Sequence, residues 1–405
     1  MYFSRAMNDR VAARLALEMQ LRDAVKAHQF VLHYQPRVDM ISGEIVGAEA
    51  LIRWEHPERG IVGPAEFIPV AEESGLIVQI GGWVIDRICA QQAAWIATNV
   101  PTVPIAANVS SVQLGHGIVA TVQDALRRHS LDARCLHLEL TESAVMHDVQ
   151  EAARIMFELR KLGISLALDD FGTGYSSLAY LKRFPFSRVK IDRSFVTDIT
   201  QNADDAAIAS AIIAIAHRMG LKVVAEGIET EAQYEYLRTQ RCDEMQGHYF
   251  SDAVAAEALE SDLLSGRSIK SPAQAAQSAQ TVLVVDDEAG IRSALTRLLR
   301  RDGYRILTAA GGPEALELLA VNPVQVIISD QLMPGMSGTE FFGKVKELYP
   351  QTMRIILSGY TELGVVIESV NRGAVFKFLT KPWDDDMLRE QVRDAFLRYR
   401  PGSNF

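Results

Sequence analysis

The segments LHLELTE at residues 136–142 and ISLALDD at residues 164–170 decide how this part of the chain folds. Both are short apolar runs that end in acidic side chains, and a longer stretch with apolar residues at helical spacing separates them. A short apolar run indicates a buried strand, and strands that alternate with helices indicate parallel βα units. The number of such units then decides which α/β fold the chain adopts.

The same pattern occurs eight times between residues 30 and 247. The runs are FVLHYQP from Phe30, EIVGAEALIRW from Glu44, PIAANVS from Pro104, LHLELTE from Leu136, ISLALDD from Ile164, RVKID from Arg188, KVVAEG from Lys222 and CDEMQG from Cys242. Eight strand and helix units in about 250 residues predict an α/β fold of the TIM-like (β/α)8 barrel type. Few residues separate the first two runs, so we expect an irregular, hairpin-like start. A doubly wound sheet is the weaker alternative.

Side chains capable of chemistry stand at the ends of all eight runs. They are Gln35, Glu49 with Arg53, Asn108, Glu139 with Glu142, Asp169 with Asp170, Lys190 with Asp192, Glu226 and Gln246. The carboxyl ends of the strands of a barrel converge on one face, where the active sites of this fold lie. The pattern therefore predicts one site to which every strand contributes.

The oxygen donors of this set are ligands that Mg²⁺ and Mn²⁺ prefer. They are Glu49, Asn108, Glu139, Asp169 and Asp170. If Asp169 bridges two ions, the pair can activate a water and stabilise the leaving oxygen of an in-line phosphoryl displacement. Without cations, several carboxylates in one pocket would repel one another. Taken singly, each carboxylate could instead cap a helix or make a surface ion pair, Lys190 could be a solvated strand end, and Gln35 and Gln246 could bond local backbone.

Residues 20–265 resemble the EAL family of cyclic di-GMP phosphodiesterases. The motifs that carry the resemblance are YQP at 34–36, EALIRW at 49–54, NVS at 108–110, ELTES at 139–143, DDFGTGYSSL at 169–178, KIDRSF at 190–195, AEGIET at 225–230 and QG at 246–247. The combination of EALIRW with DDFGTGYSSL is highly specific to that family. The resemblance implies a hydrolase that opens cyclic di-GMP to the linear dinucleotide pGpG.

The resemblance also implies roles for individual residues, carried over motif by motif. It implies that Glu49, Asn108, Glu139 and Asp169 hold one metal ion, and that Asp169 and Asp170 hold the second. Lys190 would position the attacking water, and Glu226 would support the metal and water site, so that these two and Glu49 form the catalytic group. Substrate contacts are implied for Gln35, Leu51, Arg53, Asp192 and Gln246. Glu142 would anchor the loop of residues 171–178, which in the family couples metal binding to dimerisation.

The sequence departs from that family after its last strand. Many members follow QG with an aromatic pair and then Ser-Lys-Pro or Ala-Lys-Pro, whereas this chain has Asp252 and Ala253 in place of Lys and Pro. We therefore expect the loop after the last strand to shape the guanine end of the substrate differently. The residues whose loss marks inactive relatives are all retained, which favours an enzyme over a catalytically silent receptor.

A second pattern begins at Thr281. The apolar runs there are VLVVDDE at 282–288, VQVIISD at 324–330, RIILSGY at 354–360 and VFKFLTKP at 375–382. Five strands alternating with five helices over residues 281–400 predict a flavodoxin-like doubly wound (βα)5 domain. The ends of its strands again carry acidic side chains.

Three of these acidic side chains, Asp286, Asp287 and Asp330, would meet at the carboxyl edge of the sheet and bind one Mg²⁺. Asp330 would then be the nucleophile toward a phosphoryl donor, with Ser358 and Lys381 facing the new phosphoryl oxygens. Three solvated acids at strand ends are the alternative interpretation. Residues 281–400 resemble the receiver domains of bacterial response regulators, which implies a sensor histidine kinase as partner. In that family the Lys381–Pro382 bond is cis, and Phe378 stands at the place of the switch aromatic.

The chain therefore divides into three parts. Residues 1–265 form the barrel domain, which begins with an amphipathic helix around residues 12–25. Residues 266–280, GRSIKSPAQAAQSAQ, have the composition of a linker. Residues 281–400 form the receiver.

Composition narrows the class of protein. The net charge of −10 disfavours binding to a nucleic acid polymer, because phosphate backbones attract clustered Lys and Arg. No apolar stretch is long enough to span a bilayer and the N-terminus shows no leader, so we expect no membrane association and a cytoplasmic location. Cys89, Cys135 and Cys242 fit buried thiols in a reducing compartment.

The sequence predicts a metal-dependent cyclic di-GMP phosphodiesterase that works as a homodimer and is regulated by aspartyl phosphorylation of its receiver. The alternatives are a silent cyclic di-GMP receptor and a receiver-driven signalling scaffold. Turnover of cyclic di-GMP with Mg²⁺ or Mn²⁺ would distinguish them. No GGDEF-type motif occurs, so we expect no cyclase activity.

Overall fold

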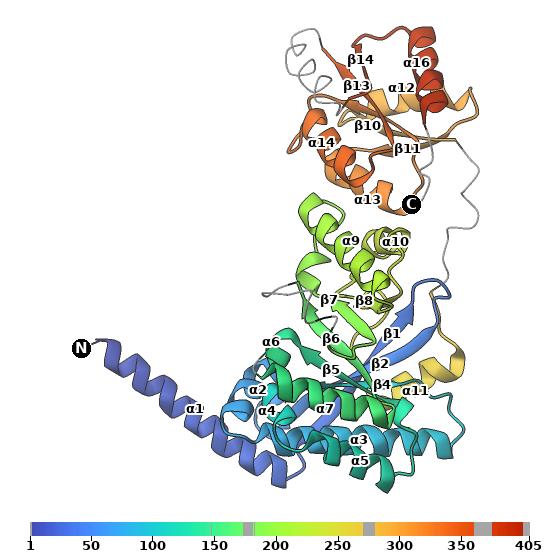
Figure 1. Cartoon of the computed structure of the whole chain (residues 1–405). Coiled ribbons are helices and arrows are strands. Elements are labelled where there is room, and N and C mark those ends of the chain that lie inside the picture. The colour runs from blue at the N-terminus through green and yellow to red at the C-terminus, as the bar shows by residue number, and fades with distance from the viewer. Residues whose placement is uncertain are drawn as a thin grey trace. The chain divides into compact units, whose positions relative to one another are not determined.

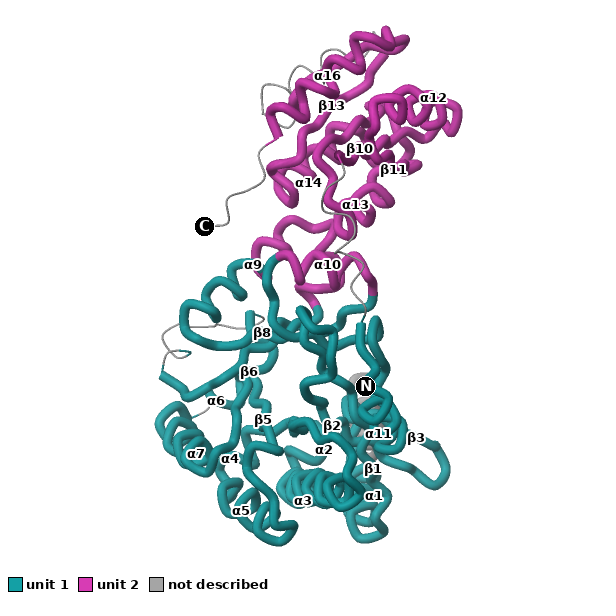
Figure 2. Tube along the Cα trace, turned by 90° about the vertical axis from the view of Figure 1, so that its right-hand side faces the viewer, with its two compact units in different colours: residues 1–193, 210–229, 240–270 teal, residues 194–209, 230–239, 271–405 magenta. Residues whose placement is uncertain are grey.

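The structure is a computed structural model that describes residues 2–146, 148–172, 181, 183–269, 280–359 and 375–399, with side chains from residue 14 on. The chain forms two compact units (Figure 2). One comprises residues 1–193, 210–229 and 240–270, and the other comprises residues 194–209, 230–239 and 271–405. Each unit holds one β-sheet. The boundaries at residues 265 and 281 stay a prediction.

The first sheet is a closed barrel with one additional strand (Figure 1). Its strands are β1 (Phe30–Asp39), β2 (Ile45–His56), β3 (Gly60–Val62), β4 (Ile105–Val109), β5 (Leu136–Thr141), β6 (Ser165–Phe171), β7 (Arg188–Ile191), β8 (Lys222–Glu226) and β9 (Glu244–Gln246). Their order is β1-β9-β8-β7-β6-β5-β4-β2-β3, and β1 also pairs with β2, which closes a ring of eight strands. The predicted (β/α)8 barrel is confirmed, and β3 is a short hairpin partner of β2.

Strand β1 departs from the parallel pattern of the barrel. It pairs antiparallel with β2 over nine residue pairs and antiparallel with β9 through Val38↔Met245 and Asp39↔Glu244. The other ring pairings, from β2 through β9, are parallel. The hairpin-like start is therefore present, because the two strands are joined too closely for a crossover helix.

Ten α-helices and two 3₁₀ turns are described in the barrel part of the sequence. They are α1 (Tyr2–Lys26), α2 (Pro64–Glu73), α3 (Ile77–Ala97), α4 (Ser111–Leu114), α5 (Ile118–Arg128), α6 (Glu142–Met146), α7 (Val149–Leu162), α9 (Ala203–Arg218), α10 (Glu231–Thr239), α11 (Ala256–Ser265) and the 3₁₀ turns Ala133–Cys135 and Arg193–Phe195. Helix α3 packs beside α5 and against β4, and α7 packs beside α5 and against β6 (Figure 1). The predicted N-terminal helix is present and longer than the sequence pattern indicated.

Local sequence signals fix where these helices end and the strands begin. At the start of α7 the Asp148 carboxylate accepts a hydrogen bond from the Glu151 N–H at 3.1 Å. At its end Gly163 has φ +98°, a left-handed conformation that favours glycine. The chain then turns directly into β6, which places Asp169 at the end of the next strand.

The second sheet is fully parallel and has the order β11-β10-β12-β13-β14. Its strands are β10 (Thr281–Val285), β11 (Arg305–Ala309), β12 (Val326–Asp330), β13 (Met353–Ser358) and β14 (Lys377–Thr380), and its described helices are α12 (Ala289–Arg300), α13 (Gly312–Val321), α14 (Gly338–Leu348) and α16 (Asp385–Arg398). Strands buried on both sides, such as VLVV of β10, form its centre. This is the predicted doubly wound fold.

Three further predictions can be compared with the structure. Cys89 and Cys242 are buried, Cys135 is half-buried, and all three are free thiols. The start of the predicted linker is attached to the barrel, because the Ile269 N–H donates to the Gly43 carbonyl at 2.9 Å. Residues 270–279 of that linker lie outside the described residues. Among the described helices, none combines the length and the apolar character needed to cross a membrane.

Candidate active site

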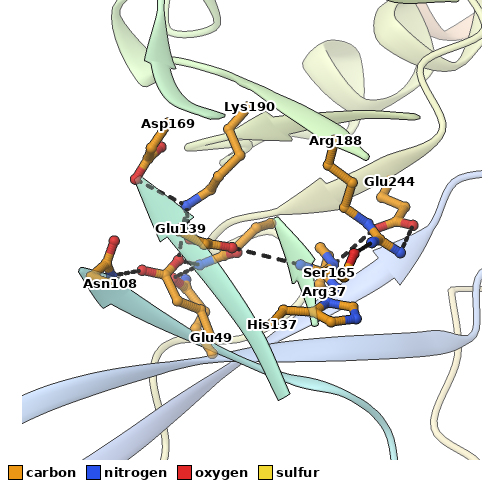
Figure 3. A network of polar contacts seen from close by, with 12 residues as sticks. Arg37, Glu49, Asn108, His137, Glu139, Ser165, Asp169, Arg188, Lys190 and Glu244 are labelled. Atoms are coloured by element: carbon orange, nitrogen blue, oxygen red, sulfur yellow. Dashed lines mark hydrogen bonds and ion pairs between the residues drawn. The ribbon is translucent and has the colours of Figure 1, made fainter. Parts of the chain in front are cut away.

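The Lys190 ammonium group lies at the centre of the predicted site (Figure 3). Its side chain is buried in β7, and its Nζ lies 3.3 Å from Glu49, 3.3 Å from Asp169 and 2.5 Å from Glu226. Nζ also donates to the Glu139 Oε2 atom. Carboxylates from β2, β5, β6 and β8 thus surround one cation. The convergence of strand ends that the sequence predicted is present.

Neutral side chains complete the polar shell around Glu49. The Asn108 Nδ2 group donates to Glu49 Oε1 at 2.6 Å, and the Gln246 Nε2 group donates to Glu49 Oε2 at 2.8 Å. Gln246 also donates to the Gln35 Oε1 atom at 2.9 Å. Gln35 lies opposite Glu49 in the antiparallel β1–β2 pair, in the middle of its strand rather than at its end. Strand β1 therefore contributes Gln35 to the site because of its pairing register with β2, although it runs antiparallel to β2.

The end of β6 is irregular where the two aspartates lie. The β6–β7 register shifts between Leu168 and Phe171, and Asp170 has φ +55°. Non-glycine residues rarely adopt this left-handed conformation, which is common near functional sites. The Asp170 N–H donates to the Asp169 carboxylate at 3.0 Å. The irregularity separates the two side chains, so that Asp169 meets Lys190 while Asp170 is half-buried beside it.

Burial and charge shift the acidity of the cluster. Burial raises the pKa of Glu139 to about 7 and that of Glu226 to about 8, although the Lys190 charge opposes both shifts. Burial also raises the pKa of Asp170, with a further contribution from the Asp169 charge. For Glu49, burial raises the pKa, but the Lys190 charge and the two amide hydrogen bonds outweigh burial and leave it below its usual range. The carboxylates of the cluster carry more negative charge than one lysine neutralises.

A cavity of about 300 Å³ opens over this cluster. The predicted residues that line it are Gln35, Glu49, Leu51, Asn108, Asp169, Lys190, Glu226 and Gln246. Of the described residues that were predicted to bind metal or substrate, Arg53, Glu139, Asp170 and Asp192 do not line this cavity. The Arg53 guanidinium donates instead to the Ile52 carbonyl at 3.0 Å.

The cavity also has lining residues that the sequence analysis did not select. They include Arg193, Glu229 and His248. Each stands one to three residues beyond a strand-end group that was selected, within KIDRSF, AEGIET and QGH. A rule that includes the first loop residues after each strand would have found them. His248 lies 3.3 Å from Asp252, one of the two residues that depart from the family pattern.

A second cavity, of about 550 Å³, adjoins the first. Most of its lining is apolar and comes from α2, α3, the middle of β2 and the end of β4, including Ile68, Ile80 and Val109. Leu51 and Asn108 line both cavities. A polar and an apolar region therefore meet at the candidate site.

A network of buried ion pairs continues from the site into the barrel core (Figure 3). The Arg37 Nε atom lies 2.7 Å from the Glu244 Oε2 atom, and its Nη1 lies 3.7 Å from the Glu139 Oε1 atom. Arg188 lies 3.4 Å and Lys222 lies 3.2 Å from the Glu244 carboxylate. Burial would raise the pKa of Glu244, but these three cations outweigh burial and hold it below its usual range.

His137 belongs to the same network and is neutral. The Arg37 Nη2 group lies 3.3 Å from its Nδ1 atom, so this nitrogen accepts and carries no proton. Burial, with the charges of Arg188 and Arg37, lowers the pKa of His137 to about 2. The sequence analysis did not select Arg37, Glu244 or His137, because Arg37 and Glu244 meet only when the barrel closes.

The predicted loop anchor is only partly described. Glu142 is buried at the start of α6, as the ELTES motif implied. Residues 173–180 of the loop lie outside the described residues. The anchoring role of Glu142 therefore stays a prediction.

The second unit carries a separate acidic site. Among the described residues, Asp286, Asp287 and Asp330 are the acidic side chains whose oxygens all lie within 4.8 Å of one another. The Lys381 Nζ atom lies 2.6 Å from Asp330 and 2.9 Å from Asp286. Burial raises the pKa of Asp330 even though the Lys381 charge opposes the shift. Ser358 ends the neighbouring strand β13, Phe378 lies in β14, and the Lys381–Pro382 bond is cis.

Comparison with known families gives two matches along the chain. The EAL domain family matches residues 18–253, and the response regulator receiver domain family matches residues 282–393. Among curated proteins of Pseudomonas aeruginosa, the bifunctional diguanylate cyclase/cyclic di-GMP phosphodiesterase MucR is 46% identical over 259 residues, which are 64% of this chain and 38% of that protein. The cyclic di-GMP phosphodiesterase NbdA is 43% identical over 260 residues, which are 64% of this chain and 33% of that protein. This chain thus spans between a third and two fifths of these relatives.

Solved structures agree with these matches. A structure described as "PaMucR Phosphodiesterase, c-di-GMP complex" is 47% identical, with a TM-score of 0.58, and covers 60% of this chain and 99% of its own. A structure of the EAL enzyme Bd1971 with cAMP and cyclic di-GMP bound is 33% identical, with a TM-score of 0.59, and covers 63% of this chain and 70% of its own. Both matches concern the barrel part of the chain.

Proposed function

Because this chain belongs to the EAL domain family and also carries a response regulator receiver domain, we propose that it hydrolyses cyclic di-GMP to linear pGpG with the help of divalent metal ions. The observation that carries this proposal is the group of four carboxylates that surrounds Lys190 beneath an open cavity, with the Asn108 amide bonded to one of them. Relatives named as cyclic di-GMP phosphodiesterases, and a relative solved with cyclic di-GMP, support the substrate.

The chemistry of the donor set fits Mg²⁺ or Mn²⁺. Glu49, Asn108, Glu139 and Asp169 offer the hard oxygen ligands that these ions prefer. Burial raises the pKa values of Glu139 and Glu226, and the charges of Glu49 and Asp169 add to both shifts, so added positive charge would favour their ionised forms. When bound, a divalent ion would polarise a phosphate oxygen and lower the pKa of a water. We propose Glu49, Asn108, Glu139 and Asp169 for one ion and Asp169 with Asp170 for a second.

The side chains of this protein would orient the reactants. Lys190 is held in one position by its carboxylate partners, so its ammonium group can direct a water toward the phosphate. Glu226 is partly open to the cavity and would accept a hydrogen bond or proton from that water. Gln35, Leu51 and Gln246 line the cavity, where they would contact the nucleotide. Contacts of the substrate with Arg53 and Asp192 also stay proposals.

The adjoining apolar cavity suits a large ligand. A cyclic dinucleotide has a charged ring of sugars and phosphates and two flat bases. The polar cavity over Lys190 matches the first part, and the lining of Ile68, Ile80 and Val109 matches the second. Leu51 and Asn108 lie where the two cavities meet.

The receiver would regulate this reaction by phosphorylation of Asp330, with a sensor histidine kinase as the phosphoryl source. Asp286, Asp287 and Asp330 form an oxygen site that suits Mg²⁺, and Lys381 would pair with the new phosphoryl oxygens. We also propose a homodimer and a cytoplasmic location.

Chromatography of nucleotides tests the enzymatic proposal. Purified full chain would be incubated with cyclic di-GMP alone, with Mg²⁺ and with Mn²⁺, and a Glu139→Gln variant would serve as the inactive reference. We expect pGpG to form only with metal and only in the parent. Binding of cyclic di-GMP without turnover under every condition would instead identify a receptor.

A further inference from the structure

Arg37 is a fully buried cation next to the proposed metal ligands. It lies on β1, two residues from Gln35, so both side chains are on the same face of the strand. Only 1% of Arg37 is exposed, and its guanidinium lies between Glu244 on one side and Glu139 on the other (Figure 3). A buried arginine that serves only to fill a barrel would be costly, because a charge must give up its hydration.

The two oxygens of Glu139 face different partners. Oε2 accepts from Lys190 and lies on the side of the cavity cluster. Oε1 is buried without a hydrogen-bond partner among the described residues, and Arg37 is its ion-pair partner at 3.7 Å. The guanidinium therefore faces Oε1 and the Lys190 ammonium group faces Oε2.

The backbone opposite Arg37 is shaped for its side chain. Gly47 pairs with Arg37 across β1 and β2. A Cβ atom at Gly47 would lie 2.4 Å from the Arg37 Nη2 atom, so only glycine leaves room for the guanidinium here. The Nη2 group of Arg37 contacts His137, and its Nε atom pairs with Glu244.

From this geometry we propose that Arg37 is a positioning residue for the metal ligand Glu139. It holds Oε1 inward and thereby presents Oε2 to a divalent ion. The inference rests on the proposed function, because it assigns Arg37 a task only if Glu139 binds metal. It places a determinant of metal affinity in the barrel core, one residue beyond the YQP motif at 34–36.

A charge-neutral double variant separates orientation from electrostatics. Loss of Arg37 alone would leave the Glu244 carboxylate buried without this partner. That negative charge could attract a cation and so disturb the measurement. In Arg37→Met/Glu244→Gln one positive and one negative charge are removed together. The matched control is Arg188→Met/Glu244→Gln, which removes the same charges and the same carboxylate but leaves Arg37 beside Glu139. Arg188 contacts Glu244 and Ser165.

Mn²⁺ binding without nucleotide is the main measurement, by calorimetry on the full chain. The background is Asp287→Asn/Asp330→Asn, which removes the receiver site. We expect the Arg37 double variant to bind Mn²⁺ at least about 10-fold more weakly than the background, as outer partners of metal ligands typically require. The Arg188 double variant should stay within about twofold of the background in Mn²⁺ affinity. It should melt at a lower temperature than the Arg37 double variant, because it leaves Arg37 buried without Glu244. Half-maximal hydrolysis should need correspondingly more Mn²⁺, with little change in KM for cyclic di-GMP.

Each outcome decides the question. Equal Mn²⁺ affinities of the two double variants would overturn the inference. If the Arg37 double variant does not fold, Arg37→Lys answers instead: weaker Mn²⁺ binding supports the inference and unchanged binding refutes it. If the background binds no Mn²⁺, or binds it equally well with Glu139→Gln, the proposed function itself fails, and this result is distinct from the others.

Discussion

At the scale of single residues, the position of Lys190 explains why so many carboxylates can share one buried place. A single ammonium group contacts Glu49, Glu139, Asp169 and Glu226, and each contact offsets part of the repulsion among them. Burial lowers the pKa of Lys190, but the carboxylates outweigh burial and raise it well above its usual range. Lys190 therefore remains charged at every physiological pH.

Replacing Asp169 by Asn tests the proposed bridging ligand. Asp169→Asn should abolish hydrolysis even at high Mg²⁺, since an amide cannot bridge two cations. The loss of rate should exceed the roughly 10–100-fold that outer partners of metal ligands cost. The control is Asp86→Asn, which changes an ion pair with Arg128 and His129 away from the site. Turnover near the parent rate in Asp169→Asn would remove the two-metal assignment.

The pKa of Glu244 predicts a dependence of stability on pH. Its pKa in the folded protein lies below the value of about 4.3 expected in the unfolded chain. Its stabilising contribution is therefore fully present above that unfolded value and is lost as the pH falls through the folded pKa. Glu244→Gln should lower the free energy of unfolding by about 3 kcal/mol at pH 7, because it leaves Arg37 buried without its partner. The loss of stability should shrink as the pH falls below about 4.3, through the lower pKa of the folded state.

Urea unfolding at a series of pH values checks this prediction, with the fluorescence of the barrel residues Trp54, Trp83 and Trp95 as the signal. Parent and variant curves that run parallel from pH 7 to pH 3 would show that the Glu244 charge does not matter for folding.

At the scale of elements, strand β1 shows what sequence patterns can and cannot predict. The short link between the first two runs predicted a hairpin, and β1 and β2 form one. Strand β3 was missed, because Gly60–Val62 is too short for an alternating pattern. Arg37 was missed for another reason: a charged residue after Pro36 looks like a surface position. Its burial depends on Glu244, which is close only in the folded barrel.

The residues of the candidate site also differ in how far the sequence predicts them. Side chains at the ends of parallel strands, such as Asp169 and Glu226, were predictable because the fold brings all those ends to one face. The ion-pair network behind them was not, since it depends on side-chain packing in the barrel interior. Arg53 was selected from its motif, yet the structure turns its guanidinium toward the Ile52 carbonyl.

The close approach of Gly47 to Arg37 predicts the effect of one methyl group. Gly47→Ala should destabilise the barrel by about 1–3 kcal/mol, because the new Cβ would force the guanidinium aside. The control Gly82→Ala lies in the middle of α3, where the nearest atom, Thr121 Cγ2, is 3.7 Å from the new Cβ. It should be neutral or stabilising by up to about 1 kcal/mol, as in other helices. Thermal unfolding compares them, and equal shifts in both variants would contradict this account.

At the scale of the whole molecule, one chain carries two acidic sites with different tasks. The cluster around Lys190 would act on an external phosphodiester, whereas Asp330 would itself become phosphorylated. Asp330 pairs with Lys381 at 2.6 Å, so a phosphoryl group there would rearrange the carboxyl edge of β12, β13 and β14. Residues 360–374, between β13 and β14, lie outside the described residues.

Phosphorylation of Asp330 should therefore change the rate of hydrolysis, and we expect the rate to rise. Turnover of cyclic di-GMP would be measured before and after treatment with acetyl phosphate or beryllofluoride, together with the oligomeric state. The control is Asp330→Ala, which should not respond to either reagent. If the untreated, acetyl phosphate-treated and beryllofluoride-treated proteins have the same rate and the same oligomeric state, the receiver does not regulate this reaction through phosphorylation.

The seam between β1 and β9 has a consequence for biosynthesis. The ring closes through the pairs Val38↔Met245 and Asp39↔Glu244, so β1 cannot complete its pairing until β9 has been synthesised. A ribosome releases β1 and β2 early, and that hairpin keeps one unpaired edge until β9 has emerged. Until then Arg37 lacks Glu244 as well. The nascent barrel must therefore remain open for most of its synthesis, and its seam is where a chaperone or an aggregating neighbour would first bind.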